Sequence, residues 1–142
     1  MNEANEQQIP NLEAMDEQQA QHFLTELLSN LSPKEEYNAR HQDYVMEMPQ
    51  SGERIRGKEN MRAMQEAYPT PQGGVSIQVR RVLVKEGLWV AEGVYGVGGE
   101  QVFHVALIFE LRDGKMWRDR WYFAEPFEAP EWRAQWVERM ES

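Results

Sequence analysis

The chain has 142 residues, a length typical of one domain that can enclose both a core and a cavity. Its formal net charge of −9 argues against a nucleic-acid partner, because binding a phosphate backbone requires a basic face. The absence of cysteine excludes disulfides, thiolate metal ligands and a cysteine nucleophile. No apolar run is long enough to cross a membrane and residues 1–10 do not resemble a secretion signal, so we expect a cytoplasmic protein.

The first half of the chain has the spacing of helices. Residues 1 to about 10 are polar and are expected to fray. Apolar residues then recur at helical spacing from Asn11, a good N-cap, to about Asn30. Pro33 fits the first turn of a second, short helix that ends near Arg40. A third helix is expected to follow Gly57 and to end at Pro69. Brief strands are predicted at 44–48 and 54–56.

From residue 75 the apolar period changes to that of a sheet. Four strands are predicted at 75–84, 88–97, 101–112 and 115–123. Short Gly-containing turns join them, including Asp113-Gly114, which favours a two-residue turn with positive φ at both positions. Tight turns between long neighbours predict an antiparallel meander. Arms of about ten residues exceed the usual strand length, so we expect a strongly curved sheet with a hollow on one side.

Pro130 is predicted to open a C-terminal helix, in a tail at about residues 128–142. Its Trp132, Trp136 and Met140 would form one apolar stripe, which would cover the mouth of the hollow or cross to a partner subunit. Helices grouped before an antiparallel sheet predict the α+β class, with helices packed on one sheet face. We expect residues 1–142 to form a single domain.

Three motifs carry a resemblance to a known family. They are Glu47-Met48-Pro49, Arg56-Gly57-Lys58-Glu59-Asn60, and Phe109-Glu110-Leu111-Arg112-Asp113-Gly114-Lys115-Met116. In their order and spacing, residues 12–124 resemble the SnoaL-like branch of the nuclear transport factor 2-like superfamily. The resemblance implies a cone of curved sheet wrapped over helices, a deep apolar pocket, and a homodimer formed through the sheet. It does not imply one function, because relatives include ketosteroid isomerases, polyketide cyclases, epoxide hydrolases, dehydratases and members without catalysis.

Asp119 is the candidate catalytic residue. Strand alternation places it between Trp117 and Trp121 on the more apolar face of the last strand, which should be the concave one. Desolvation there would raise its pKa toward the range that suits proton transfer. In SnoaL-like cyclases an acidic residue on a late strand takes a proton from the substrate, and Asp119 is the nearest match. Alternatively, Asp119 is a surface carboxylate paired with Arg118 or Arg120, and a β-bulge would reverse the face.

The predicted pocket is apolar. Its lining residues are expected to be Tyr44, Met48, Met64, Trp117 and Trp121. Ketosteroid isomerases carry their aspartate base just before the proline that ends the first strand, and here that position is Met48. A thioether cannot accept a proton from carbon, so steroid isomerisation by that route is disfavoured. Met46, Met48, Met61 and Met64 form either an adaptable pocket wall or ordinary core.

Glu92 and the three histidines are the remaining candidates for functional residues, and each also has a structural interpretation. Glu92 is either a second buried carboxylate or an acid on the surface or at a dimer contact. His22, His41 and His104 have no metal-ligand spacing, so no metal site is expected. His41 either pairs with Asp43 near the pocket mouth or caps a helix end, and His104 lies either at a dimer contact or in the cavity.

Two functional hypotheses follow. In the first, the protein binds a small apolar molecule and acts, without a cofactor, as an isomerase, cyclase or lyase on a carbonyl-bearing substrate, with Asp119 as the acid or base. In the second, it is a non-catalytic ligand-binding or dimerisation module in which Met48 marks a lost base and Asp119 is structural. The sequence alone leaves open whether the protein is an enzyme.

Overall fold

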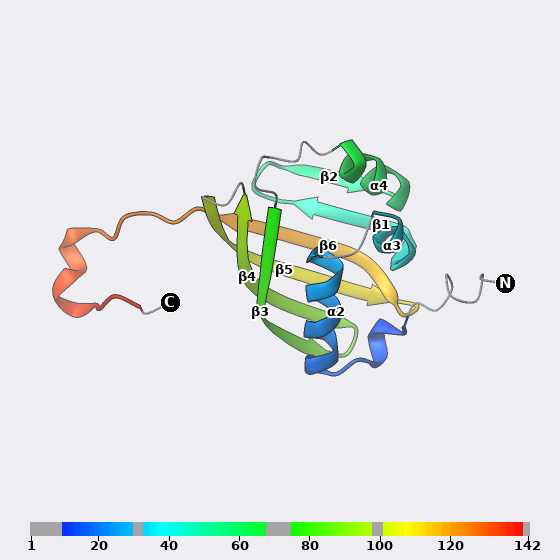
Figure 1. Ribbon diagram of the computed structural model, residues 1–142, viewed down its shortest axis with the longest axis horizontal. Helices are drawn as coiled ribbons and strands as arrows, with labels where there is room; N and C mark the ends of the chain where they lie inside the picture. The colour runs from blue at the N-terminus through cyan, green and yellow to red at the C-terminus, as the bar shows by residue number, and fades with distance from the viewer. Residues whose placement is uncertain (1–9, 30–32, 68–74, 98–100, 141–142) are drawn as a thin grey trace.

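The protein is described by a computed structural model that covers residues 10–29, 33–67, 75–97 and 101–140 (Figure 1). The helices are η1 (Leu12–Ala14), α2 (Glu17–Ser29), α3 (Pro33–Asn38), α4 (Lys58–Ala67) and η2 (Glu131–Trp136). The strands are β1 (Arg40–Met48), β2 (Glu53–Arg56), β3 (Val75–Lys85), β4 (Leu88–Val97), β5 (Gln101–Arg112) and β6 (Lys115–Ala124). No helix within the described residues is long and apolar enough to span a membrane.

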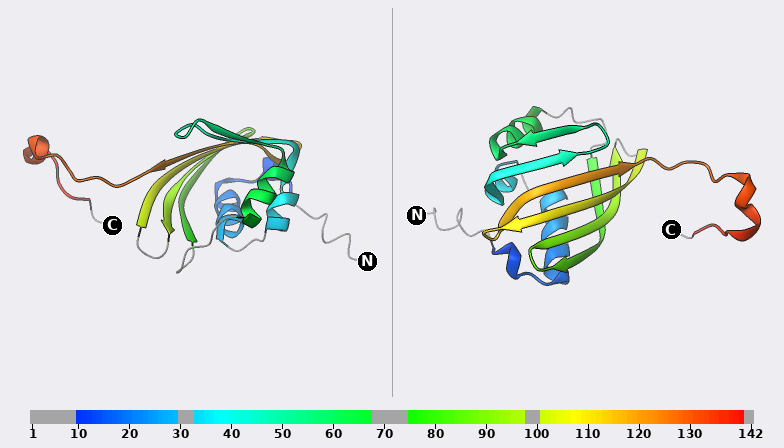
Figure 2. Two further views of the ribbon diagram at one scale, coloured as in Figure 1. Left: turned by 90° about the horizontal axis from the view of Figure 1, so that it is seen from above. Right: turned by 180° about the vertical axis from the view of Figure 1, so that it is seen from behind.

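The six strands form one curved sheet in the order β2-β1-β6-β5-β4-β3. Strands β3 to β6 pair antiparallel with their neighbours, which confirms the predicted meander, whereas β1 runs parallel to β6 and makes the sheet mixed. The sheet bends over α2, and α3 and α4 lie beside β1 and β2 on the same concave side (Figure 2). The α+β class and the helices on one face are therefore as predicted.

The hairpin between β5 and β6 has the predicted geometry. Asp113 and Gly114 have φ values of 53° and 75°, as a two-residue turn of this kind requires. The tip also anchors η1, because the Leu12 N–H donates to the Gly114 carbonyl at 3.0 Å. In return, the Gly114 N–H donates to the Glu13 carboxylate at 2.7 Å. The N-terminal turn is thereby fixed at the closed end of the hairpin.

The first predicted helix is divided in two. Asn11 caps the short η1, and α2 begins only after Asp16. The Asp16 side chain accepts a hydrogen bond from the Gln19 backbone N–H, and the Gln19 side chain accepts one from the Asp16 N–H. This reciprocal pair is a capping box, which starts a new helix and redirects the chain.

A β-bulge in β6 decides which side chains face the concave side. Glu110 pairs with Arg118, but Leu111 pairs with Met116, so Trp117 is the extra residue. Alternation is broken at that residue only. Met116 and Asp119 therefore both face the helices and are buried, while Trp117 is displaced from that face.

The chain after β6 leaves the sheet and runs away from the body (Figures 1 and 2). We call residues 125–140 the tail. Its predicted α-helix is a 3₁₀ helix of six residues, η2, with no buried residue. The apolar stripe expected to drive helix packing has nothing to pack against within the described chain, and Trp132 and Trp136 remain 74% and 71% exposed.

Candidate functional site

A cavity of 430 Å³ lies between the concave sheet face and helices α2 to α4. Its lining is mainly apolar: Leu27, Leu28, Met46, Met48, Met61, Met64, Ile77, Tyr95, Phe109, Met116, Trp121 and Phe123. Four polar residues complete the lining: Glu36, Arg40, Gln65 and Asp119. A mostly apolar cavity with a few convergent polar groups is the usual form of a small-molecule site.

Asp119 is the central polar group of this cavity. It lies on β6 beyond the bulge and is only 3% exposed. The Tyr44 hydroxyl, on the neighbouring β1, donates a hydrogen bond of 2.6 Å to Asp119 Oδ2. Asp119 Oδ1 has no hydrogen-bond partner among the described residues. One carboxyl oxygen is therefore held in position, while the other is buried without a hydrogen-bond partner among the described residues.

Burial raises the pKa of Asp119 from 3.8 to about 7. The Tyr44 hydrogen bond, the Arg40 charge and the nearby Trp121 indole N–H each lower this pKa, but they do not outweigh the desolvation. A carboxyl group with a pKa near 7 is present in both protonation states at neutral pH. It can therefore accept and return a proton without a large energetic penalty in either direction.

Arg40 is the buried cation beside this carboxyl group. Its guanidinium forms an ion pair of 2.9 Å with Glu36 and donates to the Gln65 side chain at 3.2 Å. The Gln65 amide in turn donates to Glu36, which closes a small network. The guanidinium also lies 5.0 Å from the centre of the Tyr44 ring. Burial raises the pKa of Glu36, while Gln65 and Arg40 oppose that rise.

Three buried side-chain atoms lack a hydrogen-bond partner in the described part of the chain: Arg40 Nε, Asp119 Oδ1 and Trp121 Nε1. All three belong to residues that line the cavity. A buried polar atom without a partner costs about 1–3 kcal/mol, so such atoms need an explanation. The Trp121 indole N–H is close enough to Asp119 to lower its pKa, so these two groups partly satisfy each other, while Arg40 Nε fits an oxygen acceptor of a ligand.

The structure brings together most of the residues that the sequence singled out. Met48, Met64 and Trp121 line the cavity with Asp119. Tyr44 is fully buried behind Asp119 and does not reach the cavity surface. Trp117 lies elsewhere, because the bulge turns its ring toward the guanidinium groups of Arg112 and Arg118, at 4.9 and 4.8 Å.

Arg40 was missed by sequence reasoning, which placed it at the end of a helix. In the structure it begins β1, whose first four residues are polar and gave no apolar alternation. A signal was available in the sequence, a basic residue four positions before the strand predicted at 44–48. Glu36 and Gln65 were also missed, since nothing in the pattern of α3 or α4 distinguished these polar side chains from their exposed neighbours.

The other titratable candidates lie away from the cavity. Glu92 and His104 are exposed on the convex face of the sheet. His41 accepts a hydrogen bond from the Asp43 backbone N–H at Nδ1, and its Nε2 lies 2.9 Å from the Asp113 carboxylate. It therefore ties β1 to the β5–β6 turn. The described residues contain no group of three or more His, Asp or Glu side chains that could hold a metal ion.

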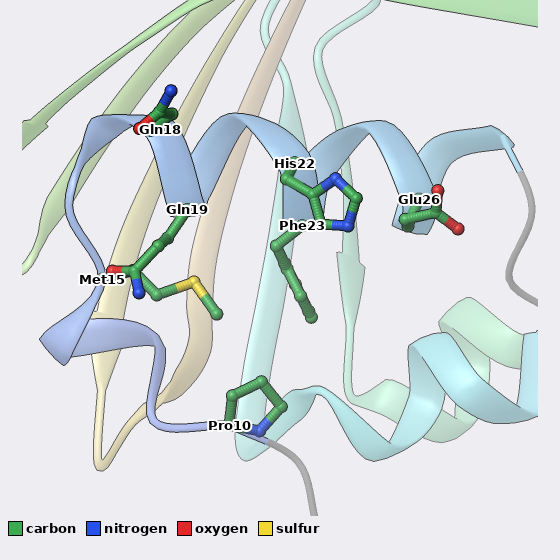
Figure 3. Close-up of a pocket in the computed structure, with 7 residues that line it drawn as sticks. All are labelled: Pro10, Met15, Gln18, Gln19, His22, Phe23 and Glu26. Atoms are coloured by element: carbon green, nitrogen blue, oxygen red, sulfur yellow. The ribbon is translucent and has the colours of Figure 1, made fainter.

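A second depression, of 590 Å³, lies along the outer surface of α2 (Figure 3). Met15 and Phe23 point into the space between the helix and Pro10. The Phe23 ring also packs edge-on against Trp89 at 6.3 Å. The depression contains neither of the two buried charged residues, Arg40 and Asp119, so the concave cavity is the better candidate for chemistry.

Comparisons with known proteins identify the family to which this fold belongs. The SnoaL-like domain family matches residues 38–119, from the end of α3 to Asp119. An NTF-2 like protein of unknown function from Burkholderia xenovorans LB400 is 35% identical, with 77% of this chain and 83% of that chain covered and a TM-score of 0.66. No curated protein matches the sequence.

More distant structures share the fold. A putative ketosteroid isomerase from Kribbella flavida DSM 17836 is 23% identical, covers 83% of this chain and 84% of its own, and has a TM-score of 0.74. A putative SnoaL-like polyketide cyclase from Jannaschia Sp. CCS1 is 14% identical, with coverages of 64% and 71% and a TM-score of 0.56. Because the family match spans more than half of the sequence, this chain belongs to the SnoaL-like domain family of the nuclear transport factor 2-like fold.

Proposed function

We propose that the protein binds a small apolar molecule with a carbonyl group and catalyses a cofactor-free proton transfer on it, as an isomerase, cyclase or lyase. The observation that carries this proposal is the state of Asp119. Its carboxyl group is buried at an apolar cavity, is anchored through one oxygen by Tyr44, and has its other oxygen unpartnered. Burial also raises the pKa of Asp119 to about 7, where a carboxylate is a stronger base than in water.

In this mechanism Asp119 Oδ1 accepts a proton from the carbon next to the carbonyl group. The electron pair of the broken C–H bond moves into a carbon–carbon bond, and negative charge develops on the carbonyl oxygen. The unpartnered N–H groups of Trp121 and Arg40 are the donors that can stabilise this oxyanion. Asp119, now protonated, returns the proton to another atom of the same molecule.

The final step determines the reaction class. Return of the proton to a different carbon gives an isomerisation. Attack of the enolate carbon on a second carbonyl group of the same molecule, with the proton going to that oxygen, gives ring closure. Loss of a leaving group that takes the proton gives an elimination. The cavity volume of 430 Å³ is suited to a molecule of moderate size in each case.

The Tyr44 hydroxyl acts on the base and not on the substrate. It donates to Asp119 Oδ2 and lies behind the cavity wall. This hydrogen bond favours the ionised carboxylate and fixes the orientation of the carboxyl group. Burial and the adjacent Asp119 raise the pKa of Tyr44 well above 10, so the hydroxyl stays protonated and remains a donor.

The same structure supports a homodimer formed through the convex face of the sheet. Leu83, Val90, Val102 and Tyr122 are all exposed there, on four adjacent strands. Exposed apolar side chains that recur on one face of a sheet commonly mark an interaction surface. This surface lies opposite the cavity, so a dimer of this kind would leave the cavity of each subunit open.

The proposal can be tested without knowing the natural substrate. Apolar ketones and 1,3-diketones are incubated with the protein in D₂O, and NMR measures the exchange of the hydrogen next to the carbonyl. We expect the wild type to catalyse exchange for at least one compound, and Asp119→Asn to reduce that rate at least about 100-fold. Glu92→Gln, at an exposed carboxylate on the convex face, is the matched control and should keep the full rate.

Two results would argue against this function. Equal exchange rates in the wild type and Asp119→Asn would remove Asp119 from catalysis. The other result is saturable binding of a compound, as measured by quenching of tryptophan fluorescence, without any exchange of its hydrogen for deuterium. That result would favour the non-catalytic ligand-binding module.

A further inference from the structure

The tail is the most exposed apolar segment of the described chain. Phe127, Trp132, Trp136 and Met140 are 79%, 74%, 71% and 90% exposed, and Val137 is also exposed. Large aromatic side chains are rarely left in water on a monomer unless they serve an interaction. The tail follows β6 directly, so its position is fixed at one end by the sheet.

The tail is directed away from its own body. Both Figure 1 and Figure 2 show the segment after β6 continuing beyond the end of the sheet and not folding back over either face. Pro126 and Pro130 stiffen the connection, because each fixes its own φ and removes a backbone donor. With His104 at the sheet end, the tail encloses an open concavity of 1000 Å³, which is wide enough to receive part of another protein chain.

The convex face of the sheet has the matching chemistry. Its exposed apolar side chains include Val102 on β5 and Tyr122 on β6, close to the point where the tail leaves the sheet. Farther along the same two strands, toward the β5–β6 turn, the outward positions carry Arg112, Arg118 and Arg120 together with Glu110, and Arg120 pairs with Glu47 at 3.0 Å. This face is thus rich in arginine within a chain of net charge −9. The tail has the opposite bias, with four glutamates and two arginines among residues 125–140.

The exposed area is sufficient for a stable contact. A large aromatic side chain can bury about 150–250 Å², so three aromatic residues at roughly three-quarters exposure, with Val137 and Met140, offer on the order of 500 Å². The surface that they cover loses a similar area. Two tails exchanged in a symmetric dimer would therefore bury on the order of 2,000 Å² in total, which is enough for a stable interface.

We propose that residues 125–140 form an exchanged arm that seats on the convex sheet face of a second copy of this chain. The exchange is reciprocal, because the same tail and the same face are present in both copies and a two-fold axis closes the assembly. The arm extends the apolar contact from the sheet face, around Val102 and Tyr122, onto the tryptophans of the partner's tail. The acidic tail also meets the arginines of that face.

Sedimentation equilibrium of the full-length chain provides the first test. We expect a dimer for the wild type, and a dissociation constant raised at least about 100-fold by Trp132→Ala combined with Trp136→Ala, since buried interface tryptophans carry much of the binding energy. Gln135→Ala lies between the two tryptophans and should leave the constant unchanged. Among the described residues η2 has no buried side chain, so these variants should fold normally, which circular dichroism checks.

Cross-linking tests where the arm is seated. The chain has no cysteine, so single cysteines can be introduced without side reactions. A mixture of Ala134→Cys and Ala106→Cys chains, the latter altered on the convex face, should form a disulfide between the two chains. Gln18→Cys, on the outer surface of α2, should not cross-link to the tail.

Three results would overturn the proposal. They are a monomer at all concentrations, a dimer whose dissociation constant is unchanged in the double tryptophan variant, and a preferred cross-link to Gln18→Cys. If the protein is a monomer, a shift in tryptophan fluorescence on adding phosphatidylcholine vesicles would assign the tail to a lipid surface instead.

Discussion

Replacing Asp119 with asparagine is expected to change how the free energy of unfolding depends on pH. Burial raises the pKa of this carboxyl group from 3.8 to about 7 in the folded protein. Between those pH values the folded state keeps a proton that the unfolded chain has released. Its contribution to stability is therefore complete below about pH 4 and is lost as the pH rises through 7.

The magnitude follows from the two pKa values. The free energy of unfolding should fall by about 1.4 kcal/mol per pH unit in this interval, or about 4 kcal/mol in total. Asparagine cannot ionise, yet its amide oxygen can still accept the Tyr44 hydrogen bond. Relative to the wild type, Asp119→Asn should therefore gain about 3 kcal/mol between pH 5 and pH 8, a range that stays above the isoelectric point of 4.9.

Urea unfolding followed by tryptophan fluorescence at pH 5, 6, 7 and 8 measures this change. Glu36 also has a pKa raised by burial, but it is present in both proteins, so its contribution largely cancels in the difference. Glu92→Gln, which replaces an exposed carboxylate, is the control, and its free energy of unfolding should follow the pH dependence of the wild type. A constant difference between Asp119→Asn and the wild type would mean that the pKa of Asp119 is not raised in the folded protein, contrary to this prediction.

Two further substitutions test the site and the sheet. Tyr44→Phe removes a hydrogen bond that lowers the pKa of Asp119, so the midpoint of the pH dependence of exchange should move above 7. Tyr122→Phe, on the convex face, is the control and should leave that midpoint in place. An unchanged midpoint in Tyr44→Phe would show that this hydrogen bond does not lower the pKa of Asp119. Gly93→Ala would place a Cβ atom 2.2 Å from a backbone carbonyl oxygen of β3 and should destabilise the fold by roughly 3 kcal/mol or more in urea unfolding. Gly52→Ala meets no atom within 4 Å and should cost only about 1–2 kcal/mol from its positive φ; equal losses at both positions would contradict this account.

Much of the fold could be predicted from local patterns. The turn glycines and the two-residue period set the β3–β6 meander, because long strands joined by short turns have one simple arrangement. The break between η1 and α2 was also encoded, in the Asp16–Gln19 capping box, but the apolar period across it continued and hid it. The parallel pairing of β1 with β6 joins strands far apart in the chain, and no local pattern specifies such a pair.

In the candidate site, too, the features set by local sequence could be predicted, and those that depend on contacts between distant segments could not. Strand alternation correctly predicted which side of the sheet Asp119 faces. The bulge at Trp117 precedes Asp119 in β6, so the bulge changed the orientation of Trp117 alone. The partners of Asp119 come from elsewhere in the chain. Tyr44 and Arg40 reach it only because β1 lies beside β6, and that pairing depends on the complete fold. The tail shows the limit of periodicity, since a stripe of tryptophans at helical spacing does not make a long helix without a surface to bury it.

The proposed proton transfer depends on the protonation state of Asp119, which a ¹³C NMR titration of its side-chain carboxyl carbon measures directly. We expect a midpoint near pH 7, and a higher midpoint in Tyr44→Phe. A midpoint near the ordinary value of 3.8 would show that the carboxylate is hydrated, and the proposed proton transfer would lose its physical basis.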